Sequence, residues 1–418
     1  MSLHASPPPG PALTPIDTAL ATLLASLPEP TATEAVLLAN ACGRVLRQAI
    51  VAEMSVPPHA NSAMDGYAVR AADTRDPMRK LPVSQRLAAG QVGKPLAIGT
   101  AARLFTGAPM PEGADAVVMQ ENCVRHGDTV CVNNAVEPGE NVRPAGADIE
   151  SGSTVFDAGR VLRPQDIGAV ASLGLTQVDV ARPLRVALMT TGDELKRPGS
   201  TLEPGQIFDA NFASLGALLE SLGATVIDCG RVGDTAEKTR AALKAAAADA
   251  DCVISTGGVS VGEEDHVRAA VEALGNIALW KLAIKPGKPF AFGRIGKDEG
   301  EACPFFGLPG NPVSAFVTFA LIVRPCLFAL QGATPQSPLT FPVRSGFARP
   351  RSGVRQEYLR ATLKRDEEGG LAALPLGNQS SGVAASLSRS EGLLVIPPDT
   401  AVALDDLLQF IPYSELGA

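Results

Sequence analysis

Three glycine-containing loops carry residue types suited to binding an anion. Each follows a short apolar run that predicts a β-strand: residues 190–195 (TTGDEL), 256–262 (TGGVSVG) and 307–314 (GLPGNPVS). Glycines such as Gly257 and Gly258 let backbone N–H groups approach an anion closely. In the third loop, Asn before Pro is typical of a helix start, whose free N–H groups also suit an anion. Any one loop alone is more often a tight turn with a helix cap, but their convergence favours a site for phosphate or another oxyanion.

Three lysines lie between the second and third loops, in the segment KLAIKPGKP. They are Lys281, Lys285 and Lys288, and the Pro and Gly residues around them predict a bend. One interpretation is that these lysines are solvent-exposed surface charges with no ligand. Beside anion-binding loops, their ammonium groups are natural partners for an oxyanion.

Carboxylates in the same region, Glu194, Asp234 and Asp265, would repel an anionic substrate if nothing compensated them. A bridging cation removes this conflict, because Mg²⁺ binds one or two carboxylates together with substrate phosphate oxygens and polarises a phosphoanhydride. Taken singly, each acid is more often a helix cap or a surface charge, and Asp265 is the most ambiguous. The sequence has four histidines and no CxxC pair, so any metal site is expected to be oxygen-ligated.

The elements that must position these loops form an α/β unit over residues 183–332. Apolar strands at 185–189, 225–229 and 252–255 alternate with helices at 211–222, 235–248, 265–274 and 312–330. This alternation predicts right-handed crossovers and a mostly parallel sheet between two layers of helices. Ligands of such sheets bind at the carboxyl ends of the strands, where the three loops lie.

The remainder of the chain predicts other kinds of unit. Residues 1–12 are Pro-rich and expected to be disordered, while 16–27, 33–46 and 164–173 have helical spacing. Short alternating runs at 103–105, 116–119 and 129–132 indicate a β-rich lobe over 50–149. The helical unit is therefore expected to be discontinuous, with the lobe between its halves. Residues 340–412 predict a small all-β domain with a turn at 366–370.

Composition narrows the class of function. The net charge of -8 opposes binding to nucleic-acid phosphates or anionic lipid, which favours a small-molecule substrate. Seven unpaired cysteines argue against a disulfide framework, and the amino end lacks the basic region of a signal peptide. The longest apolar stretch, 315–323, is well short of the ~20 residues of a membrane helix and predicts a buried core helix. We expect a soluble, cytoplasmic protein.

Two loops of the lobe, residues 62–68 (SAMDGYA) and 139–148 (GENVRPAGAD), mix turn formers with an acid. By physical chemistry alone they are ordinary hairpin connections. Together with the α/β loops, however, they complete a set of motifs. From about residue 13 onward the chain resembles the molybdopterin molybdenumtransferases, the group of MoeA and the gephyrin E domain. Seven segments match in family order: 62–68, 139–148, 192–195, 256–265, 285–289, 307–315 and 379–382.

The resemblance implies four domains and an elongated homodimer. The expected divisions are 13–49 with 150–182, 50–149, 183–332 and a barrel-like 333–418. The active site would lie between the α/β domain of one subunit and the lobe of the other. By similarity the lobe contributes Asp65, Thr106, Arg143 and Asp148, and the α/β domain contributes Glu194, Asp234, Asp265, Lys281, Lys285 and Lys288. Contacts with nucleotide phosphate or molybdate are further expected from Ser260, Ser314, Arg360, Ser380 and Ser381. One departure is visible, because Ala210 stands where the family usually has Ser.

The implied reaction takes adenylylated molybdopterin and molybdate, releases AMP and places molybdenum on the pterin's dithiolene sulfurs. Lysines and loop amides would hold the anions, Asp265 and Glu194 would organise Mg²⁺, and Asp65 or Asp148 would position molybdate or water. Contacts with the preceding adenylyltransferase and with downstream maturation proteins are also implied. Two alternatives remain: the adenylyl transfer itself, whose enzyme resembles the α/β domain alone, and a gephyrin-like scaffold. The sequence does not distinguish molybdate from tungstate.

Overall fold

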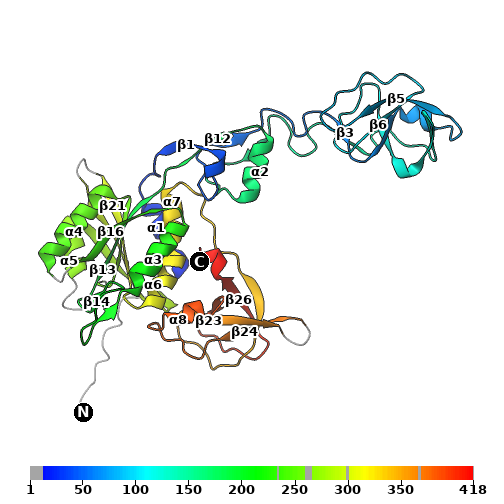
Figure 1. Cartoon of the computed structure of the whole chain (residues 1–418). Coiled ribbons are helices and arrows are strands. Elements are labelled where there is room, and N and C mark those ends of the chain that lie inside the picture. Colours follow the sequence, from blue (N-terminus) through cyan, green and yellow to red (C-terminus); the bar gives the residue numbers. More distant parts are fainter. Residues whose placement is uncertain (1–12, 233–234, 259–265, 298–300, 366–368, 418) are drawn as a thin grey trace, which may run out of the picture.

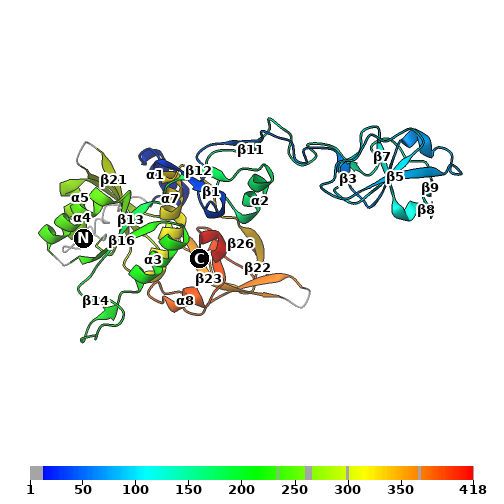
Figure 2. The ribbon, with the colours of Figure 1, turned by 45° about the horizontal axis from the view of Figure 1, so that its top comes forward.

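The computed structural model describes residues 13–232, 235–258, 266–297, 301–365 and 369–417. The chain is elongated, with an α/β unit and a C-terminal β unit side by side and a separate β-rich lobe at the far end of a long connection (Figures 1 and 2). The connection includes the short antiparallel pair β2 (Ile50–Val51) and β11 (Thr154–Phe156).

The α/β unit is built on a six-stranded sheet of order β16-β13-β17-β21-β20-β18. In chain order these strands are β13 (Arg185–Thr191), β16 (Thr225–Val232), β17 (Cys252–Thr256), β18 (Gly275–Lys281), β20 (Pro289–Gly296) and β21 (Ala302–Leu308). Strand β13 pairs in parallel with β16 and β17, and β17 pairs in parallel with β21. Strand β20 is antiparallel to both of its neighbours, so a hairpin that the sequence did not reveal extends the predicted sheet. A small parallel pair, β14 (Leu195–Lys196) and β15 (Ile207–Phe208), follows β13.

Helices cover both faces of this sheet, as the strand and helix alternation predicted. They are α1 (Ile16–Ser26), α3 (Ala210–Ser221), α6 (Pro312–Thr318) and α7 (Arg324–Leu330) on one face, and α4 (Ala236–Asp249) and α5 (His266–Leu274) on the other. Strand β13 alternates between the layers, with Val186 and Leu188 in the first core and Ala187 and Met189 in the second. Each fully buried Leu contributes about 2 kcal/mol of transfer free energy.

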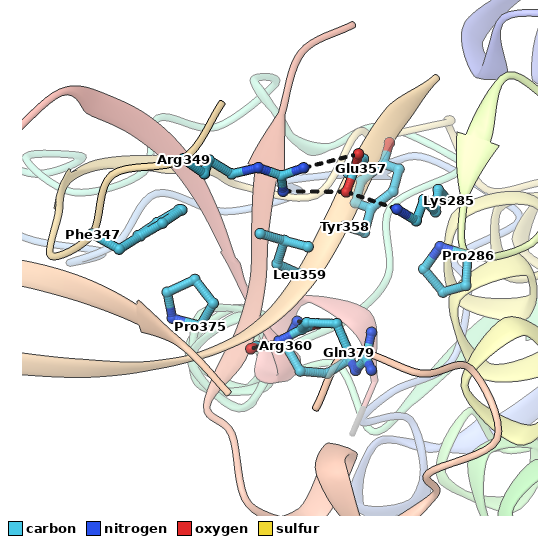
Figure 3. Close-up of a pocket in the computed structure, with 10 residues that line it drawn as sticks. All are labelled: Lys285, Pro286, Phe347, Arg349, Glu357, Tyr358, Leu359, Arg360, Pro375 and Gln379. Atoms are coloured by element: carbon cyan, nitrogen blue, oxygen red, sulfur yellow. Dashed lines mark hydrogen bonds and ion pairs between the residues drawn. The ribbon is translucent and has the colours of Figure 1, made fainter. Parts of the chain in front are cut away.

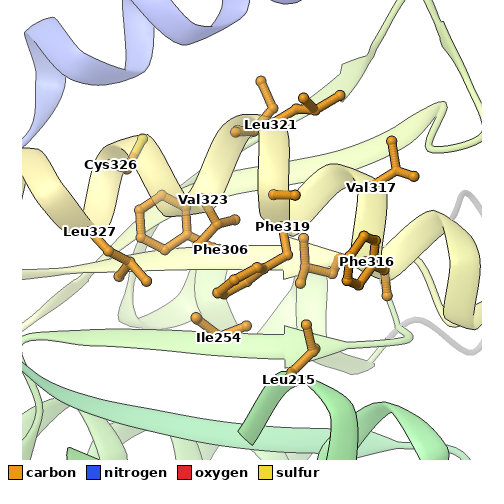
Figure 4. Packing of buried hydrophobic residues seen from close by; sticks show 14 of the residues in the cluster. Leu215, Ile254, Phe306, Phe316, Val317, Phe319, Leu321, Val323, Cys326 and Leu327 are labelled. Atoms are coloured by element: carbon orange, nitrogen blue, oxygen red, sulfur yellow. The ribbon is translucent and has the colours of Figure 1, made fainter. Parts of the chain in front are cut away.

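The run Pro312–Leu330 is one nearly continuous helix, with a π-helical turn at Phe319–Val323 between α6 and α7. It is long and apolar enough to span a membrane by length and composition, but 83% of it is buried within the protein. Phe316, Phe319 and Val323 point toward the sheet, where Phe306 and Ile254 meet them (Figure 4). The prediction of a buried core helix is confirmed.

The segments before and after the lobe lie together. Strand β1 (Thr33–Leu37) pairs with β12 (Gln177–Ala181) in antiparallel register and is followed by a 3-10 turn at Leu38–Asn40. The helix predicted over residues 33–46 is therefore wrong, because pairing with a distant strand overrides local helical spacing. The other two predicted helices of this unit are confirmed as α1 (Ile16–Ser26) and α2 (Pro164–Ser172).

The lobe contains a six-stranded sheet of order β7-β4-β6-β5-β9-β8. Its strands are β4 (Gly66–Val69), β5 (Leu81–Leu87), β6 (Ala101–Leu104), β7 (Ala116–Met119), β8 (Cys123–His126) and β9 (Thr129–Val132). Short 3-10 turns lie at Ala71–Thr74 and Gln120–Asn122. A separate pair, β3 (Asn61–Ser62) with β10 (Val142–Arg143), ties the two lobe loops of the sequence motifs together. The predicted β-rich character is confirmed.

The C-terminal unit is a small closed barrel. Its strands are β22 (Phe341–Ser345), β23 (Gln356–Arg365), β24 (Leu371–Pro375), β25 (Gly392–Ile396) and β26 (Leu407–Pro412). Pairing of β23 with both β24 and β25 closes the ring, and β19 (Ile284–Lys285) of the α/β unit adds to β23 in parallel. Short helical turns lie at α8 (Ala385–Ser388) and Tyr413–Leu416.

Candidate active site

The three glycine loops meet at one edge of the α/β sheet. Thr190 of β13 is in register with Thr256 of β17, and Thr256 with Leu308 of β21, so the strands end side by side. Gly257 N–H donates to the Leu308 carbonyl at 3.1 Å, which joins the second loop to the third. The predicted convergence of the loops is therefore present in the described residues.

The glycines of the second loop are required by geometry. Gly257 and Gly258 have φ angles of 81° and 62°. A Cβ on Gly257 would lie 2.8 Å from the Thr191 carbonyl oxygen, and one on Gly258 would lie 2.7 Å from Cγ2 of Val267. Only glycine avoids both the left-handed strain and these contacts. The loop backbone is thus free of side chains where the strands end.

The third loop differs from its prediction in one respect. Asn311 occupies the N-cap position and Pro312 the first turn, but the Asn311 side chain makes no capping hydrogen bond. The N–H of Val313 already donates to the Ser381 carbonyl at 3.0 Å. This first-turn donor is therefore occupied by the C-terminal unit and is not available to an anion.

Ala210, which stands where the family usually has Ser, lies at the start of α3 between Asp209 and Asn211. Asp209 is buried, accepts from the Thr190 hydroxyl at 2.6 Å and caps Phe212 N–H at 3.0 Å. Asn211 donates to the Gly310 carbonyl at 2.7 Å. These two residues brace the first and third loops, whereas Ala210 lines a separate apolar cavity between α3, α6 and α8.

A cavity of about 340 Å³ lies where the lysine bend meets the barrel (Figure 3). Its lining is Lys285, Pro286, Phe347, Arg349, Glu357, Tyr358, Leu359, Arg360, Pro375 and Gln379. The lining includes three cationic side chains and one carboxylate, so its formal charge is +2. Lys281 and Lys288 lie on the same bend, which is closed by the hydrogen bond from Leu282 N–H to the Lys288 carbonyl at 2.8 Å. The cavity is therefore suited to a dianion.

Arg360 is the most unusual member of the lining. Its side chain is only 1% exposed, and no carboxylate among the described residues lies within 4 Å of it. Its guanidinium donates to the Ser386 hydroxyl at 3.1 Å and to the Ser380 carbonyl at 3.0 Å. Burial lowers the pKa of Arg360, because the charged form is desolvated. A buried cation without an acidic partner is costly and is expected where an anion completes the charge balance.

Glu357 and Arg349 are site residues that the sequence did not reveal. The Arg349 guanidinium donates to both Glu357 carboxylate oxygens at 3.2 and 3.3 Å, and Lys285 Nζ lies 3.5 Å from the same carboxylate. The register of β19 with β23 places Lys285 directly beside Glu357. The only hint in the sequence was the acidic residue Glu357 within a predicted strand. Its partners Lys285 and Arg349 come from other segments, so the sequence did not indicate the ion pairs.

The remaining predicted serines are not among the residues that line the cavity. The side-chain amide of Gln379 accepts from Arg360 N–H at 3.0 Å and donates to the Arg360 carbonyl at 2.8 Å, and so holds the loop that carries Ser380 and Ser381 beside Arg360. Ser380 is exposed, and Ser314 is buried in the first turn of α6. The hydroxyls of Ser255, Thr256 and Thr318 are buried without a hydrogen-bond partner in the described structure, which is consistent with a polar ligand or water nearby.

The carboxylates of the α/β unit are only partly described. Glu194 is exposed and its carboxylate lies over Gly192, where an added Cβ would be 2.5 Å from Oε2. Asp234, Asp265 and Ser260 lie outside the described residues. Within the described ranges no cluster of three acids, histidines or cysteines gathers. Of the two acids that the sequence predicts as Mg²⁺ ligands, the structure therefore describes only Glu194, and the predicted magnesium site stays a prediction.

The lobe residues form a second group. The Asp65 carboxylate accepts from Thr106 N–H and from the Thr106 hydroxyl, both at 2.7 Å. These hydrogen bonds lower the pKa of Asp65, with a smaller contribution from Arg103. Arg143 and Asp148 are exposed on the neighbouring loop. Within one chain the lobe is far from the α/β unit, so the two groups of predicted site residues do not meet (Figures 1 and 2).

Comparison with known proteins identifies the family of this chain. Family models match residues 14–174 (MoeA N-terminal region, domain I and II), 187–329 (probable molybdopterin binding domain) and 342–411 (MoeA C-terminal region, domain IV). A molybdopterin molybdenumtransferase of Haemophilus influenzae is 36% identical over 96% of this chain and 99% of its own length. The chain belongs to the molybdopterin molybdenumtransferase family.

Other members of this family are similarly related. Molybdopterin molybdenumtransferase 2 of Mycobacterium tuberculosis (strain H37Rv) is 37% identical over 87% of this chain and 90% of its own. The solved structure of a molybdopterin biosynthesis MoeA protein from Pyrococcus horikoshii OT3 has a TM-score of 0.81 and 31% identity, and it covers 96% of this chain and 100% of that one. The family resemblance and the multidomain fold class inferred from the sequence are confirmed.

Proposed function

We propose that this chain is the transferase of molybdenum cofactor biosynthesis that inserts molybdenum from molybdate into adenylylated molybdopterin, with release of AMP. The observation that carries the proposal is the cavity at Lys285, Arg349, Glu357 and Arg360, whose formal charge of +2 matches the charge of molybdate. The names of the relatives and the three family models support the same chemistry.

The residues of the cavity would bind molybdate. Arg360 is preorganised by its bonds to Ser386 and Ser380 and presents a planar guanidinium, which suits a tetrahedral oxyanion. Lys285 adds a second cation to the lining of the cavity. Because molybdate is held by groups that do not move, little reorganisation is needed when charge develops at the reacting oxygens.

The glycine loops would bind the phosphate groups of the pterin. The loop backbone at Gly257 and Gly258 is free of side chains at the strand ends, and Lys281 and Lys288 extend from the adjacent bend. Glu194, with Asp265, would hold Mg²⁺, and the metal would polarise the phosphoanhydride. We therefore expect loss of activity in a chelator and recovery on addition of Mg²⁺.

The two groups of site residues would be joined in a homodimer. Asp65, Thr106, Arg143 and Asp148 lie on a lobe that extends away from the α/β unit of its own chain (Figure 1). A second copy related by twofold symmetry would bring its lobe to that unit and complete the site. Asp65, held by Thr106, or Asp148 would then position molybdate or water.

The experiment that tests the function is direct. Purified protein with adenylylated molybdopterin, molybdate and Mg²⁺ is expected to release AMP, with molybdenum recovered on the pterin. Molybdate omission is the control. AMP release that does not depend on molybdate would overturn the proposal.

The seven cysteines form no disulfide, in keeping with the cytoplasmic location that we infer.

A further inference from the structure

A row of basic and aromatic side chains lies on one face of the lobe sheet. Arg86 of β5 is in register with Arg103 of β6, and Arg103 is in register with Tyr67 of β4. Directly paired residues on neighbouring strands point to the same face. The two arginines are therefore neighbours on that face.

Phe105 stacks with both guanidinium groups. The Arg86 Cζ atom lies 4.5 Å from the centre of the Phe105 ring, and the Arg103 Cζ atom lies 4.9 Å from it. Arg103 is also fixed by donating to the Gly66 carbonyl at 2.9 Å and to Gln120 Oε1 at 2.5 Å. Such stacking orients a guanidinium while its N–H groups in the plane stay available to a ligand.

Among the described residues no carboxylate lies within 4 Å of either guanidinium, and Arg103 has only a weaker electrostatic interaction with Asp65. Arg86 is exposed, and the described part of the chain contributes no hydrogen bond to its guanidinium. Like charges on directly paired positions of a sheet are unfavourable. An isolated surface arginine would need no explanation, but two adjacent ones on an aromatic ring in a chain of net charge -8 favour an anionic ligand.

The pair lies at the site edge of the lobe. Strand β6 ends at Leu104, so Phe105 and Thr106 follow it immediately, and Gly66 of β4 pairs with Leu104. Asp65 precedes Gly66 and is bonded to Thr106. The arginine pair thus lies next to the lobe residues that are candidates for catalysis, although no sequence motif singled out Arg86, Arg103 or Phe105.

We propose that Arg86 and Arg103, stacked on Phe105, form a phosphate-binding subsite that the lobe contributes to the organic phosphate substrate. This proposal rests on the proposed function, because the substrate is the phosphorylated pterin held mainly by the other subunit. Arg86, with its free donors, binds the phosphate, and Arg103 adds charge from a fixed position. Binding by this subsite lowers the KM for the pterin and leaves the molybdate site unchanged.

The test compares Arg86→Ala and Arg86→Lys with wild type. At saturating molybdate and Mg²⁺, Arg86→Ala is expected to raise the KM for adenylylated molybdopterin about tenfold or more, as for loss of one charge-assisted hydrogen bond. The kcat and the KM for molybdate should stay within about twofold. Arg86→Lys keeps the positive charge but loses the planar guanidinium that stacks on Phe105, so its KM should lie between those of wild type and Arg86→Ala.

Arg125→Ala is the matched control, because Arg125 is an exposed arginine on β8 of the same lobe. A KM of Arg86→Ala within twofold of that of Arg125→Ala would overturn the subsite while leaving the proposed function intact. Direct titration with adenylylated molybdopterin in the absence of molybdate tests the subsite independently of turnover. Equal affinity of wild type and Arg86→Ala there would also overturn it, whereas a wild type without molybdate-dependent AMP release would overturn the proposed function instead.

Discussion

Replacing Arg360 by Met should affect the stability of the protein and its affinity for molybdate to very different extents. The change removes charge-assisted hydrogen bonds of 3.0 and 3.1 Å, worth about 1.5 to 3 kcal/mol each, or about 3 to 6 kcal/mol together. It also removes a desolvated charge without an acidic partner, whose burial costs several kcal/mol. Since the two contributions oppose each other, we expect the free energy of unfolding to change by at most about 2 kcal/mol.

Molybdate binding should respond much more strongly than stability. At an effective dielectric constant near 20, two unit charges 4 Å apart attract by about 4 kcal/mol, and water competes for part of this. A net loss of about 3 kcal/mol corresponds to a fall in affinity of about 150-fold. Arg360→Lys keeps the charge but loses the planar fork, so its affinity should be intermediate.

The assay is thermal unfolding with and without molybdate. Molybdate at 100 times its Kd should stabilise wild type by about 2.7 kcal/mol, while the same concentration should stabilise Arg360→Met by only about 0.3 kcal/mol. Chloride at equal ionic strength controls for general salt effects. If molybdate raised the Tm of Arg360→Met as much as that of wild type, the cavity at Arg360 would not be the molybdate site.

Two further predictions concern the lobe and the glycine loop. Thr106→Val removes the hydroxyl that lowers the pKa of Asp65 but keeps the backbone donor. The pKa of Asp65 should then rise, and since the role proposed for Asp65 uses its ionised carboxylate, the acidic limb of the kcat/KM profile should move to higher pH; an unmoved limb would show that Asp65 is not the titrating group. Gly258→Ala places a Cβ 2.7 Å from Val267 at a φ of 62°. The strain of about 1 to 3 kcal/mol should lower the Tm by several degrees, and a Tm equal to that of wild type would contradict the steric argument.

The α/β unit was predictable because its strands are buried on both faces. Strands such as β13 and β17 are continuous apolar runs between amphipathic helices, so local pattern and final position agree. The strand at Thr33–Leu37 was not predictable, because its partner β12 lies more than a hundred residues away. The edge hairpin β18–β20 was missed for a related reason: its lysine and glycine residues resemble a loop until the pairing is known.

The candidate site divides in the same way. The glycine loops and the lysine bend are local motifs, so the sequence indicated them and the strand order brings them together. The partners of Lys285 are not local: Glu357 and Arg349 reach it because β19 joins the barrel sheet. The buried, acid-free environment of Arg360 likewise depends on the loop that Gln379 holds. Which charged side chains line the same cavity can be determined only when the packing of the α/β unit against the barrel is known.

The separation of the lobe from the α/β unit leads to the most direct test of the account. Asp65→Asn damages the lobe half of the site and Arg360→Met damages the other half, so at a molybdate concentration near the wild-type Kd each variant alone should be nearly inactive in molybdate-dependent AMP release. After co-refolding equal amounts, half of the dimers are mixed, and each mixed dimer has one site built from two intact halves. The account predicts recovery of about a quarter of wild-type activity. Activity no higher than that of the separate variants, with subunit exchange verified by differently tagged chains, would contradict it.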